Sequence, residues 1–116
     1  MALSGYCRIL APMLHQADDS SFTQEVLQYP GPVLVDFYTT TCQPCRQLEP
    51  ELRSLATQIP GVKVVKVDCG RAPNVAAHFG VRSVPVLIGF QNGEAVQRVN
   101  GKPPLPRLRQ LMQSLL

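Results

Sequence analysis

Two cysteines three residues apart, Cys42 and Cys45, are the clearest candidates for chemistry in this sequence. Gln43 and Pro44 lie between them. In the first turn of a helix they would share one face, with their Cα atoms within disulfide reach. Backbone N–H groups and the dipole at the helix start favour a thiolate on Cys42. We therefore predict that Cys42 attacks a substrate disulfide and that Cys45 then attacks the mixed disulfide and releases the reduced substrate.

Metal binding is the alternative use of such a cysteine pair. A structural zinc site needs four ligands, normally with a second closely spaced pair. The remaining candidates form no such pair: Cys7, Cys69, His15 and His78. Zinc is therefore disfavoured, and we expect no metal and no bound cofactor. An iron–sulfur or metal centre held by the Cys42 and Cys45 of two subunits would give colour or metal in the purified protein.

Asp36 interrupts an otherwise apolar run over residues 33–38, six positions before Cys42. Burial disfavours the charged form of a carboxyl group, so its pKa should be raised. We favour a role in which Asp36 exchanges a proton with Cys45 through water. The alternative is a hydrogen-bonded buried group or an ion pair with Lys66 on the neighbouring strand.

The Val84-Pro85 bond stands at the start of a predicted strand, where proline is tolerated. A cis bond would turn the Val84 backbone outward beside the cysteines, where an extended substrate could add as a strand. The residues alone leave the isomer open, since only about one X–Pro bond in twenty is cis.

Apolar runs and turn residues predict the elements that would position these groups. Ser21 and Gln24 have the spacing of a capping box at a helix start. Asn92-Gly93 predicts a β-hairpin turn. We expect helices over 21–28, 42–58 (with a kink at Pro50) and 73–78, strands over 33–38, 62–67, 85–90 and 94–99, and a terminal helix buried through Leu105, Leu108, Leu111, Met112 and Leu115. This order indicates an α/β fold with a mixed central sheet and helices on both faces.

Length and composition limit the class of protein. The 116 residues are 45% hydrophobic and 16% charged, which indicates one folded domain and excludes disorder. No apolar run is long enough for a membrane helix. Residues 1–60 carry a net charge of −3 and residues 61–116 carry +6, but the basic residues are scattered, so we expect no nucleic-acid binding. Residues 1–17 are interpreted as an N-terminal segment, either a first strand or an extension, with a processed transit segment as the alternative, and residues 18–116 as the domain.

From about Asp18 to Leu116 the chain resembles the thioredoxin family. The matching pieces are Asp19-Ser-Ser-Phe22, Val33-Leu-Val-Asp-Phe37, Cys42-x-Pro-Cys45-Arg46, Pro50, Lys66-Val-Asp68, Phe79-Gly-Val-Arg-Ser-Val-Pro85, Asn92-Gly-Glu94 and Gly101. The resemblance implies a thioredoxin fold with four to five strands, thiol–disulfide exchange on proteins and a cis bond before Pro85. It also marks Asp36 as the family's buried acid and Lys66 as its neighbouring lysine, which supports proton transfer. We expect substrate contacts at Thr41, Gln43, Pro44, Val84, Pro85 and Gly101.

Three residues near the cysteines depart from the family pattern. Thr41 replaces a tryptophan, Gln43 replaces a glycine, and Tyr38 stands where tryptophan is common. The chain consequently contains no tryptophan. These changes affect the expected substrate range, redox potential and recognition by a reductase, but the dithiol is retained.

The resulting hypothesis is a small, soluble, monomeric protein-disulfide reductase. It would act on protein disulfides in the cytoplasm or another reducing compartment, such as an organelle stroma. A thioredoxin reductase or an equivalent donor would supply the electrons. The alternative is a non-catalytic thioredoxin-like binding module that docks protein partners through the same groove.

Overall fold

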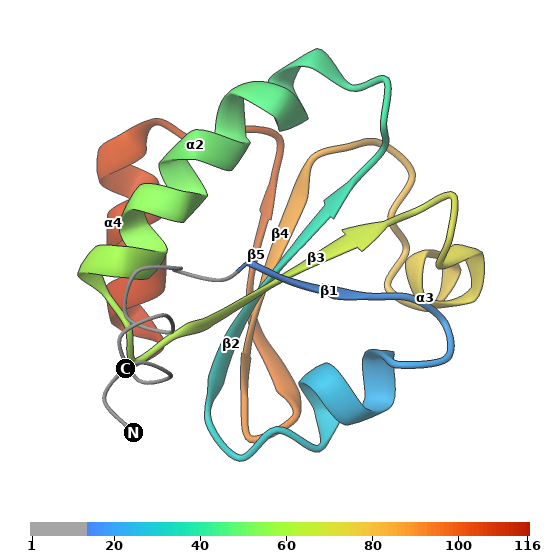
Figure 1. Cartoon of the computed structure of the whole chain (residues 1–116), viewed down its shortest axis with the longest axis horizontal. Helices are drawn as coiled ribbons and strands as arrows, with labels where there is room; N and C mark the ends of the chain where they lie inside the picture. Colours follow the sequence, from blue (N-terminus) through green and yellow to red (C-terminus); the bar gives the residue numbers. More distant parts are fainter. Residues whose placement is uncertain (1–13) are drawn as a thin grey trace, which may run out of the picture.

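The computed structural model describes residues 14–116, which form a mixed five-stranded sheet in the order β1-β3-β2-β4-β5 (Figure 1). Strands β1, β3 and β2 are parallel, whereas β4 is antiparallel to β2 and β5 is antiparallel to β4. The elements in chain order are β1 His15–Ala17, η1 Thr23–Leu27, β2 Pro32–Tyr38, α2 Gln43–Gln58, β3 Lys63–Asp68, α3 Pro73–His78, β4 Val86–Gln91, β5 Glu94–Asn100 and α4 Leu105–Ser114.

Strand β1 lies within residues 1–17, the segment for which the sequence predicts either a first strand or an extension. β1 pairs with β3, and Gln16 is the Cα partner of Lys66. Residues 1–13, with Cys7 and any processed segment, lie outside the described residues.

Central strand β2 is apolar almost throughout because helices cover both faces of the sheet. Val33, Val35 and Phe37 contribute to one core, while Leu34 contributes to the other. Since side chains alternate along a strand, Asp36 shares the face of Leu34. Asp36 is also the parallel partner of Lys66 on β3, which places the two residues side by side on that face.

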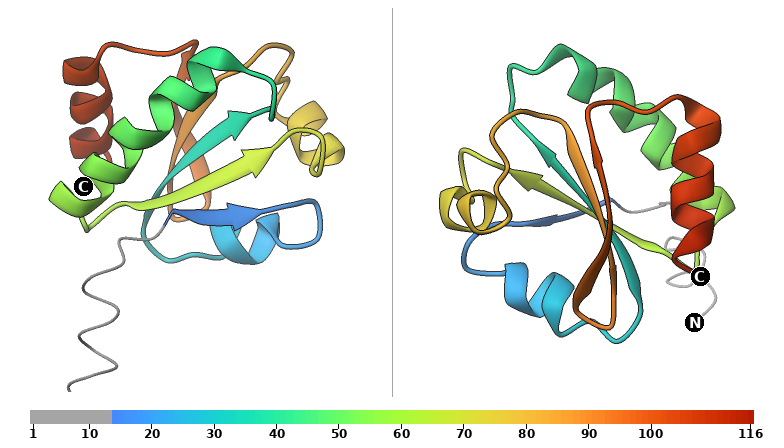
Figure 2. Two further views of the ribbon diagram at one scale, coloured as in Figure 1. Left: turned by 45° about the horizontal axis from the view of Figure 1, so that its top comes forward. Right: turned by 180° about the vertical axis from the view of Figure 1, so that it is seen from behind.

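The two cores are covered by different helices (Figure 2). One face packs against η1 and α3 through Phe22, Val26 and Ala72. The other packs against α2 and α4, and Asp36 lies on this second face. The residues that the two helices and the end of α4 contribute to this core are Leu48, Leu52, Leu55, Leu108, Leu111, Met112 and the C-cap residue Leu115.

The capping box predicted at Ser21 is wrong. The short helix η1 is a π-helix with Phe22 at its N-cap and no side-chain cap. The Asp18 carboxylate instead accepts the backbone N–H groups of Ser20 and Ser21, at 2.9 and 3.1 Å. Asp18 precedes the turn and reaches these donors directly, which leaves the Ser21 hydroxyl as a donor to the same carboxylate.

Helix α4 begins its apolar face one turn later than predicted. Leu105 is 41% exposed, whereas Leu108, Leu111 and Met112 are completely buried. Leu105 is the first residue of the helix and does not belong to the core between α2 and α4. The predicted role of Leu105 in the core is therefore wrong.

The predicted hairpin joins β4 to β5. Asn92 and Gly93 both have positive φ, 51° and 82°, as a two-residue hairpin turn of this sequence requires. A Cβ on Gly93 would collide with the backbone carbonyl oxygen of Leu27, so the turn packs directly against the end of η1. Helix α2 continues through Pro50, and the kink predicted there stays a prediction.

Candidate active site

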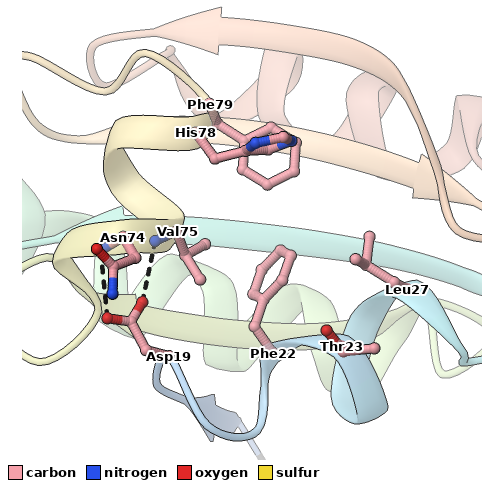
Figure 3. A pocket seen from close by; sticks show the side chains of 8 residues that line it. All are labelled: Asp19, Phe22, Thr23, Leu27, Asn74, Val75, His78 and Phe79. Atoms are coloured by element: carbon pink, nitrogen blue, oxygen red, sulfur yellow. Dashed lines mark hydrogen bonds between the residues drawn. The ribbon is translucent and has the colours of Figure 1, made fainter.

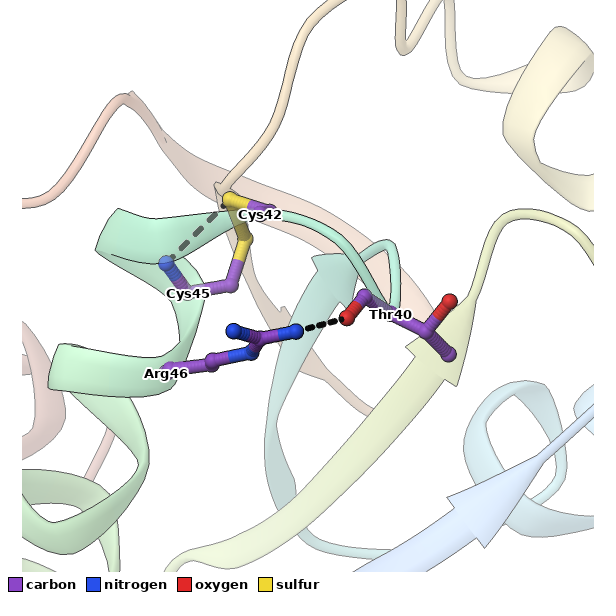
Figure 4. The surroundings of a disulfide bond; sticks show 4 residues. All are labelled: Thr40, Cys42, Cys45 and Arg46. Carbon is purple, nitrogen blue, oxygen red and sulfur yellow. Dashed lines mark hydrogen bonds between the residues drawn. A yellow bond between two sulfur atoms is a disulfide. The ribbon is translucent and has the colours of Figure 1, made fainter.

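Cys42 and Cys45 are joined by a disulfide at the start of α2, with their Cα atoms 5.3 Å apart (Figure 4). Cys42 is the N-cap residue of this helix, and Pro44 occupies the first turn, where a missing N–H group costs nothing. The backbone N–H of Cys45 donates to Cys42 Sγ at 3.2 Å. After reduction, this donor and the helix N-terminus would favour the thiolate of Cys42.

The two cysteine residues differ in exposure to solvent. Cys45 is 5% exposed, whereas Cys42 is half-buried at the helix end. An incoming protein disulfide can therefore reach Cys42 more readily than Cys45. This difference matches the order of attack predicted from the sequence, with Cys42 first.

The loop before the cysteines is held by Arg46. Its guanidinium group donates to the carbonyl oxygen of Thr40 at 2.8 Å (Figure 4). The Cys42 N–H donates to the carbonyl of Thr39 at 3.3 Å. Thr41, Gln43 and Pro44 are exposed around this loop, where they are available for contact with a partner.

Val84, Pro85 and Gly101 lie at the same end of the sheet as the cysteines. The Val84-Pro85 bond is cis, as the resemblance implied. Val86 is the partner of Phe37, so Pro85 lies beside the carboxyl end of β2, from which the chain leads to Cys42. The Gly101 N–H donates to the Pro85 carbonyl at 2.8 Å. The substrate-contact residues predicted from sequence are thus brought to one end of the fold.

Asp36 is completely buried below this end, and neither of its carboxylate oxygens has a hydrogen-bond partner among residues 14–116. Burial raises the pKa of Asp36 to about 7, an effect opposed by the Lys66 ammonium and reinforced by the Glu49 carboxylate. The predicted rise in pKa agrees with this result. A carboxyl group with such a pKa can bind and release a proton near neutral pH.

The alternative predictions for Asp36, an ion pair with Lys66 or a hydrogen-bonded buried group, are both wrong. Lys66 Nζ instead donates to Glu49 Oε1 and lies 4.2 Å from the centroid of the Tyr38 ring. Glu49 extends from α2 over the sheet and takes the ammonium group, while Asp36 is left unpaired.

Sequence reasoning missed Glu49. It follows Cys45 by four residues, and residues at this spacing share one face of a helix. That spacing was a signal that Glu49 faces the same region as Cys45. A cavity of about 180 Å³ lies there, lined by residues including Tyr38, Cys45, Glu49 and Lys66.

A second pocket lies between η1 and α3, and none of the predicted site residues lines it (Figure 3). At one side of this pocket the Asp19 carboxylate accepts the N–H groups of Asn74 and Val75, at 3.2 and 2.9 Å (Figure 3). Phe22 and Phe79 form its apolar wall, with ring centroids 5.6 Å apart. Asp19 thereby fastens the start of α3 to the segment before η1.

The other cysteine among the described residues has no part in the site. Cys69 follows β3, and its backbone N–H donates to the Tyr38 carbonyl at 2.9 Å. Burial raises the pKa of the Cys69 thiol, which makes it a poor nucleophile near neutral pH.

The fold and the disulfide together define a class of protein, the dithiol–disulfide oxidoreductases with a thioredoxin fold. The family model for thioredoxin matches residues 13–114. Thioredoxin 1 of Nostoc sp. is 43% identical over 102 residues, which cover 87% of this chain and 95% of that protein. Thioredoxin 1 of Synechococcus elongatus is 45% identical over 87 residues, covering 74% and 81%. The solved structure of a mutant thioredoxin from Halobacterium salinarum superposes with a TM-score of 0.82 at 33% identity, covering 90% of this chain and 91% of that one.

The chain belongs to the thioredoxin family. The predicted fold class is confirmed, as is the predicted activity of a thiol-disulfide oxidoreductase that reduces protein disulfides. Thioredoxins in general act on protein disulfides and are themselves reduced by thioredoxin reductase. Within residues 14–116, none of the helices combines the length and apolar character needed to cross a membrane.

Proposed function

We propose that this chain reduces protein disulfides with Cys42 as the attacking residue, Cys45 as the resolving residue and Asp36 as the proton acceptor. The observation that carries the proposal is the Cys42–Cys45 disulfide, with Cys42 half-buried at the helix end and Cys45 buried. Lys66 supports the proton transfer without pairing with Asp36, because its charge lowers the Asp36 pKa against the effect of burial and so keeps part of the carboxyl group ionised near neutral pH.

The first step joins the protein to its substrate. The Cys42 thiolate attacks one sulfur of the substrate disulfide and forms a mixed disulfide. The other substrate sulfur leaves as a thiolate and takes a proton from water. The Cys45 N–H donor and the helix N-terminus favour the attacking thiolate.

The second step releases the substrate. The Cys45 thiol gives its proton to the Asp36 carboxylate through water, and its sulfur attacks Cys42 Sγ. The Cys42–substrate bond breaks, and the second substrate sulfur leaves as a thiolate that takes up a proton. Two electrons have then moved from the cysteine pair to the substrate, and the pair ends as a disulfide.

Substrate contacts are assigned to Thr41, Gln43, Pro44, Val84, Pro85 and Gly101. The exposure of Thr41 and Gln43 and the position of Pro85 beside the end of β2 support this assignment. An extended segment of the substrate would pair with the Val84 backbone as an added strand. Electrons would return through a thioredoxin reductase or an equivalent donor in a reducing compartment, the cytoplasm or an organelle stroma, with the chain acting as a monomer.

Two cysteine variants test the order of attack. Cys42→Ser should abolish reduction of a protein disulfide, because the accessible nucleophile is lost. Cys45→Ser should retain the first step and accumulate a mixed disulfide, measured by intact-protein mass spectrometry after brief exposure to a disulfide-containing protein. Normal turnover by either variant would contradict the assignment. Partner binding without turnover in the unmodified protein would favour a binding module instead.

The redox potential of the cysteine pair gives an independent measurement. Equilibration against glutathione mixtures should place it in the reducing range typical of thioredoxins, at about −270 mV. A potential above about −180 mV would point to an oxidase or isomerase instead.

A further inference from the structure

Lys66 is placed to pair with Asp36 but binds another carboxylate. The two residues are Cα partners on β3 and β2, and both face α2. The Lys66 ammonium nevertheless donates to Glu49 Oε1, and its side chain is only 10% exposed. Both oxygens of the completely buried Asp36 remain without a hydrogen-bond partner in the part of the chain that the structure describes.

The charged groups around Asp36 come from two neighbouring elements. Lys66 approaches from β3 and lowers the pKa of Asp36, while Glu49 approaches from α2 and raises it. The partner of Asp36 on β4 is Leu87, which carries no charge. Tyr38, two residues along β2, lies with its ring against the Lys66 ammonium.

We propose that Glu49 is a positioning residue that holds the Lys66 ammonium away from Asp36 and so controls when this buried carboxyl group binds a proton. The consequence for catalysis rests on the proton-transfer role proposed for Asp36. A carboxylate paired directly with an ammonium would be a weaker base towards the Cys45 thiol.

Replacing Glu49 by glutamine has two effects of the same sign. It frees Lys66 to pair with Asp36, and it removes a negative charge near Asp36. Both favour the ionised form of Asp36 and therefore lower its pKa. An opposite charge at close range moves a carboxyl pKa by about one to three units, so the expected change is large enough to measure.

The chain contains a matched control for this arrangement. Lys63, also on β3, lies 3.0 Å from Glu25 Oε1 and 4.4 Å from the centroid of the Tyr29 ring. The residue types are the same as those of Lys66, Glu49 and Tyr38, but Lys63 pairs with Val33 at the opposite end of β2. Glu25→Gln therefore removes an equivalent ion pair away from Asp36.

The experiment is a carbon-13 NMR titration of the Asp36 carboxyl group in the oxidised protein. Glu49→Gln should lower the titration midpoint by about one pH unit or more, and Glu25→Gln should leave it unchanged. The proposal fails if Glu49→Gln leaves the midpoint in place or if Glu25→Gln moves it equally. Peak dispersion in the same spectra reports whether each variant is folded.

A Lys66→Met background separates positioning from the direct charge of Glu49. If Glu49 acts by holding Lys66, then Glu49→Gln should move the Asp36 midpoint much less in this background than in the natural sequence. Equal changes in the two backgrounds would show that Glu49 acts through its own charge, which overturns the positioning role.

Single-turnover kinetics of mixed-disulfide resolution tests the proton-transfer role of Asp36 separately from the positioning role of Glu49. Glu49→Gln should move the pH profile of mixed-disulfide resolution towards lower pH together with the NMR midpoint. If Asp36→Asn left the resolution rate unchanged, the proton-transfer role would fail. The NMR comparison would still decide whether Glu49 positions Lys66.

Discussion

The Asp36 carboxyl group connects the chemistry of the site to the stability of the fold. Its pKa is about 7 in the folded protein and 3.8 in an ordinary aqueous setting, and burial is the largest cause of the difference. Between these two values the folded state binds the proton more tightly than the unfolded chain does. The free energy of unfolding therefore falls as the pH rises from about 4 to about 7.

Asp36→Asn should consequently stabilise the oxidised protein at pH 8. The difference in pKa corresponds to an upper limit of about 4 kcal/mol, from which the burial of an amide removes about 1–3 kcal/mol. We expect a net gain of about 1–3 kcal/mol in urea unfolding at pH 8, which disappears towards pH 4 because the buried carboxyl group is then protonated in the folded protein. A gain that does not change between these pH values would show that the ionisation of Asp36 is not its source.

The sequence predicts the types of residue at this site, but not the direction in which each side chain points. The buried acid and the cysteine pair were predictable because an Asp inside an apolar strand and a Cys-x-x-Cys before a helix are local patterns. The choice of Lys66 between two carboxylates was not predictable. It depends on how α2 is rotated above the sheet, and only the packed structure fixes that rotation.

At the scale of the elements, the hairpin between β4 and β5 is held by one close contact. Gly93 has φ of 82°, and any Cβ there would collide with the Leu27 carbonyl at the end of η1. Gly80 also has positive φ, 64°, but a Cβ there would meet nothing within 4 Å. These two glycines share the backbone requirement and differ in their surroundings.

Gly93→Ala should therefore destabilise the protein more than Gly80→Ala does. A left-handed conformation costs a residue with a Cβ about 1–2 kcal/mol, which applies to both variants. The collision with Leu27 should bring the loss at Gly93 to about 3 kcal/mol or more. Urea unfolding of the oxidised variants measures both losses, and equal values would mean that the hairpin moves away from η1 without penalty.

Some of the helices, strands and turns were predictable from local sequence patterns, and others were not. Helix α2, strand β2 and the Asn92-Gly93 turn were predictable because their patterns are local and their neighbours reinforce them. The start of η1 was predicted wrongly because the Asp18 carboxylate accepts the Ser21 N–H, the donor that the Gln24 side chain would take in a capping box, and also binds the Ser21 hydroxyl. Leu105 was predicted wrongly because periodicity does not show where along its length a helix meets the core.

At the scale of the whole molecule, the central strands link the two cores. β2 supplies Val33, Val35 and Phe37 to the core beneath η1 and α3, and Leu34 to the core beneath α2 and α4. Loss of either core would expose one face of β2, and β2 also contributes side chains to the other core. The chain should therefore unfold in one cooperative transition, although its helices lie in two layers (Figure 2).

One variant in each core tests this prediction. Val26 of η1 and Leu111 of α4 are both completely buried, on opposite faces of the sheet. Leu111→Ala should cost about 2–5 kcal/mol, and Val26→Ala about 1–3 kcal/mol because valine is a smaller side chain and loses less buried apolar surface when cut back to alanine. Since the two sites belong to different cores on opposite faces of the sheet, the double variant should lose the sum within about 0.5 kcal/mol.

The shape of the unfolding curve shows whether the two cores unfold together. Urea titrations followed by far-UV circular dichroism and by tyrosine fluorescence should give coincident single transitions for both single variants and for the double variant. If Leu111→Ala produced an early phase in one signal only, the layer formed by α2 and α4 would unfold separately. Asp36, Lys66 and Glu49 lie between β2, β3 and α2, so separate unfolding would also disperse the groups that control proton transfer. Cooperative unfolding therefore preserves the arrangement around Asp36 whenever the fold is intact.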